Sequence, residues 1–238
     1  MSLFTAYASK YSGLPYLAVA VTDRVSPDSV APYKESRFPL CIELRVDLCE
    51  KQDPESVKNT LRSFAAFPRL LTIRSSSEGG NWQESDAVRH SLYSETLSDA
   101  EGIDIELSAR SICAPLIREC KALNKTVIGS FHDFSATPSI EKLDALVLEG
   151  KSLGVDAVKV AAHCHSSDDL RRLTCFLMSH PQDALIVMGM GRDGTPSRLF
   201  FPFLGSLLTY TFVGTPSAPG QKNLDEMLHF LNYLLPEF

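Results

Sequence analysis

Short apolar runs alternate with segments of helical periodicity along most of the chain. Eight of these runs have the length of a strand and are rich in aliphatic residues. They cover residues 16–22, 41–48, 69–75, 103–107, 126–134, 155–162, 184–190 and 208–213. Strands that alternate with helices are typical of an α/β protein with a parallel sheet.

Most of the intervening segments carry an apolar stripe at helical spacing. Such stripes predict helices within residues 57–65, 112–123, 139–147, 167–177 and 224–235. The segment after the first strand is different because it has prolines near both ends, Pro27 and Pro32. We expect that segment to be short or irregular.

Eight strands with intervening helices in 238 residues predict a single (β/α)8 TIM barrel over residues 1–238, since this fold takes ~250 residues. A doubly wound open sheet is the rival architecture. Residues 189–194 support the rival, because they fit the dinucleotide fingerprint G-x-G-x-x-G. An acidic residue about 20 positions further on is missing, however, and Gly214 lies in that region. We therefore interpret these glycines as turn formers.

Charged and aliphatic residues alternate on several predicted strands. In the second strand Glu43 and Arg45 share one face, and in the fourth Asp104 and Glu106 do. A surface antiparallel sheet alternates in the same way, but the intervening helices favour a barrel with its polar faces inside. Buried charges cost several kcal/mol unless they are paired or used, so this pattern predicts an active site. The expected cluster is Glu43, Arg45, Arg74, Glu78, Asp104, Glu106, His132 and Lys159.

Lys159 lies on an apolar strand between the small residues Ala157 and Ala161 of the same face. Desolvation disfavours its ammonium form, and the free amine attacks ketones to form an imine. A lysine that reaches solvent from the strand end is the alternative. An imine acidifies the neighbouring carbon, and His132 on the preceding strand is suited to move that proton, although a structural histidine is also common.

Two further segments carry candidate ligand-binding groups. Arg198 follows the glycine-rich turn and has the geometry to bind a carboxylate, or it caps the helix that it begins. Residues 217–221 form a Pro/Gly loop after the last strand, which suits either a turn or a lid. The two methionines of the seventh strand, Met188 and Met190, share one face.

Charge and cysteine usage narrow the class of protein. The net charge of −6 argues against a nucleic-acid partner, and no apolar run reaches the ~18 residues of a membrane span. The chain starts without a signal-peptide pattern, so we expect a cytoplasmic protein. The six cysteines form no Cys-x-x-Cys pair, which predicts reduced thiols. His163 and His165 flank Cys164, but adjacent residues of a strand point to opposite sides, so we expect no metal there.

At this point the sequence resembles the type I 3-dehydroquinate dehydratases, the Schiff-base-forming dehydroquinases of the shikimate pathway. The resemblance runs in order over most of the chain. The segments that carry it are residues 43–47, 74–80, 104–107, 130–134, 158–161, 188–199 and 217–221. Each segment alone is a weak signal, whereas all of them in order at barrel spacing are specific.

The resemblance implies the roles of individual residues. Lys159 would be the Schiff-base lysine, His132 the general acid/base and Glu78 the group that orients the histidine. Arg198 would hold the substrate carboxylate, and Met188 and Met190 would pack against the substrate ring. The residues that would bind ring hydroxyls or order the loops are Glu43, Arg45, Arg74, Ser217 and Gln221.

The resemblance also implies a reaction and its partners. The family converts 3-dehydroquinate to 3-dehydroshikimate by syn elimination of water, on the way to chorismate and the aromatic amino acids. It uses no metal and no nucleotide cofactor, and its partner is the small-molecule substrate. A homodimer is the assembly to be considered. Some members are fused to shikimate dehydrogenase, so the chain is either a whole protein or a piece of such a fusion.

The sequence differs from the family pattern at two points, and two other functions are alternatives to the dehydratase. Phe131 stands where the family has a more polar residue, but it faces away from His132. The segment before the first strand is short for a hairpin that closes the barrel. A class I aldolase or transaldolase-like barrel also uses a strand lysine. A barrel that binds a quinate-like acid without catalysis is the second alternative.

Overall fold

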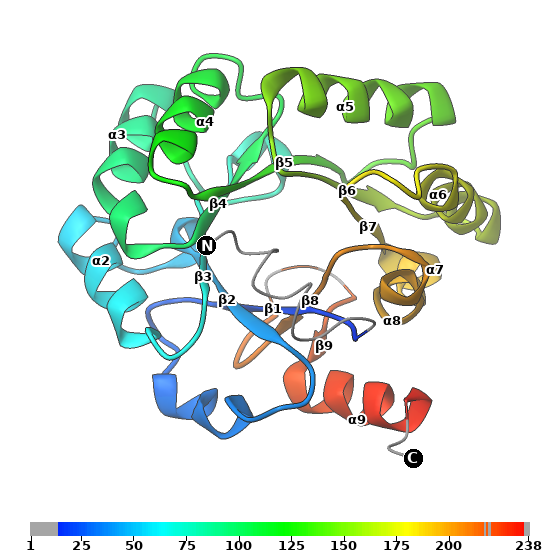
Figure 1. Cartoon of the computed structure of the whole chain (residues 1–238), viewed down its shortest axis with the longest axis horizontal. Helices are drawn as coiled ribbons and strands as arrows, with labels where there is room; N and C mark the ends of the chain where they lie inside the picture. Colours follow the sequence, from blue (N-terminus) through cyan, green and yellow to red (C-terminus); the bar gives the residue numbers. More distant parts are fainter. Residues whose placement is uncertain (1–13, 217, 219, 236–238) are drawn as a thin grey trace.

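The strands form one parallel sheet that curls into a ring of strands with helices outside. In the computed structural model, residues 14–216, 218 and 220–235 are described. The strand order is β7-β6-β5-β4-β3-β2-β1-β8-β9, and Figure 1 shows the ring from the amino ends of the strands. The strands are β1 Leu17–Val21, β2 Leu40–Arg45, β3 Arg69–Thr72, β4 Gly102–Glu106, β5 Thr126–Asp133, β6 Ala157–His163, β7 Leu185–Met190, β8 Thr209–Phe212 and β9 Lys222–Asn223.

The two sides of the ring meet between β7 and β8. No ladder joins these two strands within the described residues. At their amino ends the Leu207 N–H donates to the carbonyl of Leu185 at 2.8 Å, and the Val187 N–H donates to Ser206 Oγ at 3.0 Å. The predicted α/β fold with a parallel sheet is therefore confirmed, and a fully closed (β/α)8 barrel is taken up below as a proposal.

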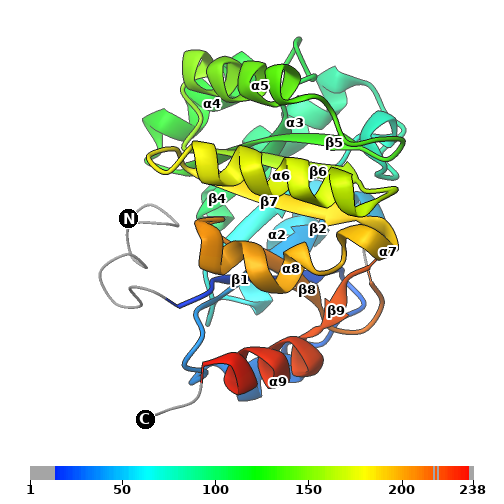
Figure 2. The same ribbon diagram turned by 90° about the vertical axis from the view of Figure 1, so that its right-hand side faces the viewer.

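The helices cover the outside of the sheet and begin where the sequence provides caps (Figure 2). Asp53, Ser85, Ser139, Ser166 and Asn223 each accept a hydrogen bond from the first turn of the helix that follows. The α-helices are α2 Pro54–Ser63, α3 Asp86–Thr96, α4 Cys113–Ala122, α5 Ile140–Leu153, α6 Ser167–Ser179, α7 Gly191–Gly194, α8 Ser197–Phe200 and α9 Leu224–Leu234.

Short 3-10 turns occupy several connections. As expected, the segment after β1 forms only η1 Pro27–Ser29 and η2 Ala31–Tyr33, each with a proline at its start. The others are η3 Val46–Leu48, η4 Ser76–Glu78, η5 Leu97–Asp99 and η6 Phe201–Leu204. Two of these, η3 directly after β2 and η4 in the loop after β3, carry side chains that are described with the site below.

Helix α3 was not predicted from the sequence. Its buried residues are Arg89, Leu92, Tyr93 and Thr96, so its inward side is largely polar. Its Val88, by contrast, is 48% exposed. An apolar stripe, the signal used for the other helices, is therefore absent from this segment.

The two faces of each strand lie in different surroundings. Aliphatic residues on the outer face pack beneath the helices, and Phe131 joins them, as its position in the strand predicted. The inner face is apolar at the amino ends, where Tyr16, Cys41 and Ile128 pack together. Charged side chains replace them toward the carboxyl ends, as Glu43 and Arg45 do above Cys41 in β2. The charges thus collect at one end of the ring.

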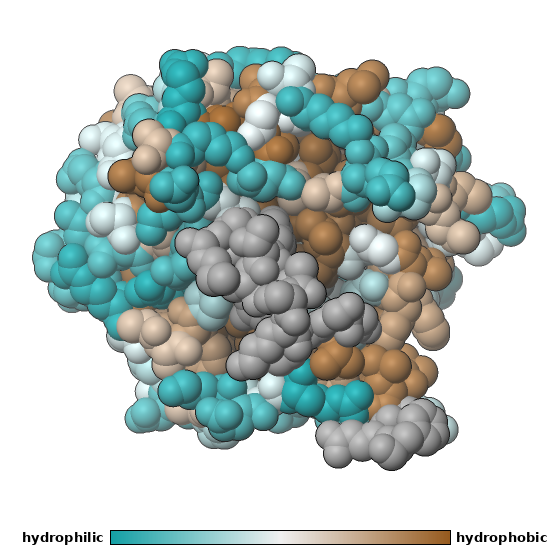
Figure 3. All heavy atoms as spheres, viewed as in Figure 1, coloured by the Kyte–Doolittle hydropathy of each residue, from teal (hydrophilic) through white to brown (hydrophobic). Residues whose placement is uncertain are grey.

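Apolar side chains are exposed on one side of the molecule. Figure 3 shows apolar surface on the side where α8 and the end of α9 lie. The exposed large apolar residues of α8, η6 and α9 are Phe200, Phe203, Leu204, Phe230, Tyr233 and Leu234. In the part of the chain that the structure describes, no helix is both long and apolar enough to cross a membrane. The segment before β1, which the sequence indicated to be short for a hairpin that closes the barrel, falls largely in residues 1–13, outside the described residues.

Candidate active site

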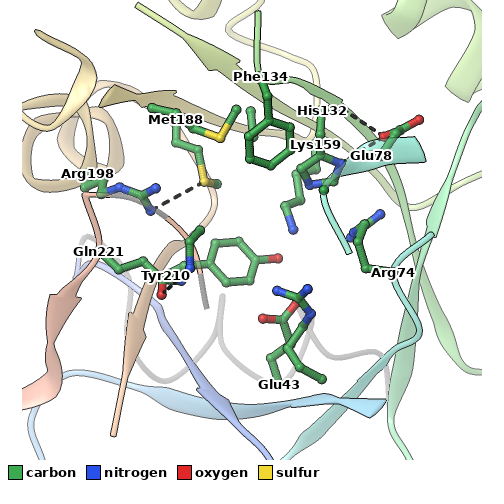
Figure 4. Close-up of a pocket in the computed structure, with 15 residues that line it drawn as sticks. Glu43, Arg74, Glu78, His132, Phe134, Lys159, Met188, Arg198, Tyr210 and Gln221 are labelled. Atoms are coloured by element: carbon green, nitrogen blue, oxygen red, sulfur yellow. Dashed lines mark hydrogen bonds and ion pairs between the residues drawn. The ribbon is translucent and has the colours of Figure 1, made fainter. Parts of the chain in front are cut away.

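A pocket opens at the carboxyl ends of the strands and gathers the predicted residues (Figure 4). Ten of the eleven residues to which the resemblance gives a role line it, and the remaining one, Ser217, lies outside the described residues. Asp104 and Glu106 of the expected cluster are buried but do not line it. Phe134 and Tyr210, which the sequence analysis did not name as site residues, also line it. The full lining is Glu43, Arg45, Arg74, Glu78, Gly79, His132, Phe134, Lys159, Ala161, Met188, Met190, Arg198, Tyr210, Ala218 and Gln221.

Lys159 projects from β6 into the pocket and is only 5% exposed. Its Nζ lies 2.8 Å from Asp104 Oδ2 and 4.1 Å from the ring centroid of Tyr210. Burial lowers the pKa of Lys159 and outweighs the carboxylates of Asp104 and Glu43, which raise it. Lys159 is therefore a buried amine with an increased tendency to lose its proton.

Arg74, at the end of β3, links the two buried carboxylates of β4. Its Nη2 lies 2.6 Å from Asp104 Oδ1, and its Nη1 lies 3.0 Å from Glu106 Oε1. Its Nη1 also donates to Ser130 Oγ at 2.7 Å. Burial alone would raise the pKa of Asp104, but Arg74 and Lys159 hold it far below its ordinary range. Asp104 thus stays ionised between two cations.

Helix α3 contacts this group of charges through the buried side chains of Arg89 and Tyr93. Arg89 is 2% exposed, and its Nη1 lies 2.8 Å from Glu106 Oε2. The Tyr93 hydroxyl donates to the Asp104 carbonyl at 2.8 Å and accepts from the Ile73 N–H at 2.9 Å. The helix that the sequence analysis missed therefore contacts the Glu106 carboxylate and the backbone of Asp104.

His132, near the end of β5, is held by Glu78 of η4. Glu78 Oε2 lies 2.9 Å from His132 Nδ1 and also accepts from the His132 backbone N–H at 2.9 Å. Burial, reinforced by Arg74 and Lys159, lowers the pKa of His132 well below its ordinary value. The histidine is therefore neutral at neutral pH, with Nδ1 held by the carboxylate.

The carboxyl end of β2 supplies a second ion pair. Arg45 donates through Nε and Nη2 to the carboxylate of Asp47 at 3.0 and 2.8 Å. Asp47 also accepts the backbone N–H groups of Arg74 and Asn81, so it ties η3 to the loop after β3. Glu43 accepts a hydrogen bond of 3.0 Å from the Thr72 hydroxyl. These contacts order the loops around the pocket.

The opposite side of the pocket is built from β7, α8 and the loop before β9. Arg198 is 2% exposed, and its Nη1 lies 3.8 Å from the sulfur of Met188. Burial lowers the pKa of Arg198 to about 10. Gln221 accepts a hydrogen bond of 3.2 Å from the Ala218 N–H. This side offers a buried cation beside thioether sulfur.

The glycines after β7 act in two ways. Gly191 has a φ of 76°, so it forms a turn, as expected from the sequence. Gly189 instead provides space, because a Cβ there would lie 2.7 Å from the Cα of Gly194. The close approach lets α7 pack against the end of β7 and brings Arg198 to the pocket.

The histidines after Lys159 form no ion-binding group. The rings of His163 and His165 lie 4.5 Å apart, whereas Cys164 is buried beneath the helices. No set of three His, Cys, Asp or Glu side chains among the described residues has the geometry to hold a metal ion. All six cysteines are free thiols; five of them are buried, and Cys175 is exposed.

Comparison with known proteins decides the family. The family model for type I 3-dehydroquinase matches residues 31–236. The chain belongs to the type I 3-dehydroquinase family. The 3-dehydroquinate dehydratase of Thermodesulfovibrio yellowstonii is 35% identical over 224 residues, covering 93% of this chain and 96% of the relative. The one from Methanosarcina barkeri is 36% identical over 204 residues, covering 81% and 84%.

Solved structures of the dehydroquinase family have the same fold. The type I 3-dehydroquinate dehydratase from Clostridium difficile superposes with a TM-score of 0.84 at 27% identity, covering 94% of each chain. The Aquifex aeolicus 3-dehydroquinate dehydratase gives a TM-score of 0.81 at 30% identity, covering 94% of this chain and all of the other. The prediction of a type I 3-dehydroquinate dehydratase is confirmed. The homodimer, the extent of the domain and the residue roles stay predictions.

Proposed function

We propose that this dehydroquinase removes water from 3-dehydroquinate to give 3-dehydroshikimate, through an imine on Lys159, as a step of the shikimate pathway. The observation that carries the proposal is the buried amine of Lys159, with its lowered pKa, in a pocket shared with His132 and Arg198.

We also propose that the curled sheet works as a closed (β/α)8 barrel, because backbone and side-chain hydrogen bonds already join β7 to the segment before β8.

In the first step the free amine of Lys159 attacks the ketone carbon of the substrate. A C–N bond forms, the carbonyl oxygen takes up one proton from the amine and one from solvent, and that oxygen leaves as water to give a protonated imine. Asp104, 2.8 Å from Nζ, stabilises the positive charge that the imine nitrogen then carries. Ala161 on the same strand face leaves room for the substrate carbon beside the amine.

His132 is the proposed base and acid of the elimination. Glu78 accepts the Nδ1 proton, which leaves Nε2 with a lone pair, and Figure 4 shows the imidazole beside Lys159. The iminium draws electrons from the neighbouring carbon, so Nε2 takes a proton there and an enamine intermediate forms. The same proton then goes to the departing hydroxyl, which leaves as water. One group serving both transfers gives elimination from one face. A water molecule then hydrolyses the conjugated iminium, which releases the product ketone and the amine of Lys159.

The remaining side chains are assigned to binding. Arg198 binds the substrate carboxylate, because a negative partner would restore its lowered pKa. Met188 and Met190 pack against the ring from the same wall. The residues assigned to ring hydroxyls or to ordering the loops are Glu43, Arg45, Arg74, Ser217 and Gln221.

Borohydride trapping tests the proposal directly. Sodium borohydride reduces an imine to a stable amine, so mixing it with enzyme and 3-dehydroquinate should add a substrate- or product-sized mass to the peptide that contains Lys159. The Lys159→Ala variant should lose turnover by at least about 10⁴-fold and form no adduct. Lys159→Met is the matched control for side-chain volume and should behave in the same way.

Three results would contradict the proposal. An adduct on another residue would show that this residue, and not Lys159, is the nucleophile. Near-normal turnover in folded Lys159→Ala excludes the imine route. A folded enzyme that forms no adduct and does not convert 3-dehydroquinate is a binding protein, or it acts on another carbonyl compound such as a sugar phosphate.

A further inference from the structure

Tyr210 stands on β8 with its ring against the amine of Lys159. It is 3% exposed, and Lys159 Nζ lies 4.1 Å from its ring centroid. Its hydroxyl is fully buried and has no hydrogen-bond partner among the described residues. A cation that lies over an aromatic ring interacts with the face of the ring alone. The contact with Lys159 therefore accounts for an aromatic residue at position 210 but not for its hydroxyl group.

The oxygen of Tyr210 is unfavourable for the unliganded fold. A buried hydroxyl without a partner lowers stability, because it loses its hydrogen bonds to water and gains none in return. Phenylalanine would fill the same space and keep the contact with Lys159. A group that is unsatisfied in the free protein and lines the ligand pocket is therefore expected to find its partner on the ligand.

The position of the hydroxyl limits which ligand atom it can reach. Figure 4 shows the ring lying across the pocket, with the hydroxyl directed between Lys159 and Glu43. Since the ring packs against Nζ, the hydroxyl faces atoms close to the carbon that bonds to Nζ. Burial, followed by the charges of Glu43 and Asp104, raises the pKa of Tyr210 well above its ordinary value. The phenol therefore keeps its proton and acts as a donor.

The chemistry of the substrate then selects the partner. In 3-dehydroquinate the imine forms at carbon 3, whose two neighbours are carbon 2 and carbon 4. Carbon 2 carries only hydrogen and is the carbon assigned to His132. Carbon 4 carries a hydroxyl. We propose that the Tyr210 hydroxyl donates a hydrogen bond to the carbon-4 hydroxyl of the substrate, which makes Tyr210 a specificity-determining residue. This inference rests on the proposed dehydration of 3-dehydroquinate.

The test combines Tyr210→Phe with a substrate that lacks the carbon-4 hydroxyl. For 3-dehydroquinate the variant should lose about tenfold in kcat/KM, as expected for one neutral hydrogen bond made in a buried site. For the 4-deoxy analogue, wild type and Tyr210→Phe should have equal kcat/KM. The Tm of the unliganded variant should be equal to or higher than that of wild type, because an unsatisfied hydroxyl has been removed.

A matched control is Tyr16, a buried tyrosine that directly precedes β1 and does not line the pocket. Tyr16→Phe should leave kcat/KM unchanged for both substrates. An equal loss in Tyr210→Phe with both substrates, or no loss with either, would overturn the assignment while wild-type turnover keeps the proposed function. A wild type that does not turn over 3-dehydroquinate at all would overturn both.

Discussion

Two buried arginines face the same pocket from opposite walls and have contrasting surroundings. The charged wall consists of Arg74, Asp104, Glu106, His132 and Lys159, and the sulfur wall consists of Met188, Met190 and Arg198. Asp104 and Glu106 raise the pKa of Arg74 far above its ordinary value, despite burial that lowers it. Burial lowers the pKa of Arg198 to about 10. The same side chain thus meets carboxylates on one wall and thioether sulfur on the other.

The contrast indicates how the two walls divide the work. On the charged wall the protein itself supplies the negative charge, so lysine and histidine are held in fixed positions before substrate arrives. On the sulfur wall the cation is better stabilised when a ligand brings a carboxylate. The substrate of a dehydroquinase is such a carboxylate. We therefore expect changes in the charged wall to affect chemistry and stability, and changes in the sulfur wall to affect binding.

Among the substitutions that test the difference between the charged wall and the sulfur wall, His132→Ala should have the largest effect. Loss of the general acid/base should lower kcat by about 10³–10⁴-fold, which corresponds to about 4–5.5 kcal/mol. The imine on Lys159 should still form and should accumulate. Stopped-flow kinetics with borohydride trapping would measure both. Turnover equal to that of wild type would show that another group moves the proton.

Arg74→Met should have the next largest effect, and it should appear in stability. The substitution leaves Asp104 and Glu106 with less compensation in a buried site, although Lys159 and Arg89 still contact them. We expect the free energy of unfolding to fall by about 3–5 kcal/mol, measured by urea denaturation. A loss below about 1 kcal/mol would mean that the charged wall does not depend on Arg74.

Arg198→Met is the matched change on the sulfur wall. It should leave the free energy of unfolding within about 1 kcal/mol of wild type, because it removes a charge that burial already disfavours. It should raise KM by about 100-fold, since it removes charge-assisted hydrogen bonds to the substrate carboxylate. Steady-state kinetics would separate KM from kcat. A stability loss as large as that of Arg74→Met would abolish the distinction between the walls.

The sequence predicted the charged wall better than the supports behind it. Alternation on β2 and β4 placed Glu43, Arg45, Asp104 and Glu106 on one inner face, because side-chain direction in a strand follows directly from position. The support from Arg89 and Tyr93 was missed, since α3 buries polar groups that pair only after the fold has formed. Which distant charges meet depends on tertiary contacts that strand parity does not specify.

The sulfur wall shows a second limit of sequence reasoning. Met188 and Arg198 were named, but no sequence pattern indicated that they would contact each other. Their contact depends on how α7 and α8 pack back against β7, which the close approach of Gly189 and Gly194 allows. Tyr210 was missed for a related reason. It lies within a run that identified β8, and an aromatic residue in a strand is ordinarily a packing residue. Its hydroxyl becomes informative only once Lys159 is placed against its ring.

The pH dependence of stability gives the smallest expected effect and tests the charged wall without substrate. The pKa of His132 is lowered in the folded protein by burial and by Arg74 and Lys159, so below about pH 6.5 the unfolded chain binds a proton that the folded protein does not. Stability should therefore fall as pH drops, by up to about 1.4 kcal/mol per pH unit from this group. Urea unfolding between pH 7 and pH 5 would measure it, and His132→Gln should remove that part of the slope.

His180 precedes the amino end of β7 and provides a control, because its pKa is shifted in the opposite direction to that of His132. It lies between Asp144 and Asp183, at 3.0 and 2.8 Å, and these hydrogen bonds outweigh burial and raise its pKa. A raised pKa contributes stability that is present at low pH and is lost as pH rises through the folded pKa. His180→Gln should therefore steepen the loss of stability toward pH 5, because the opposing contribution is gone. If His132→Gln and His180→Gln shifted the slope in the same direction, burial among cations would not be what holds His132 neutral.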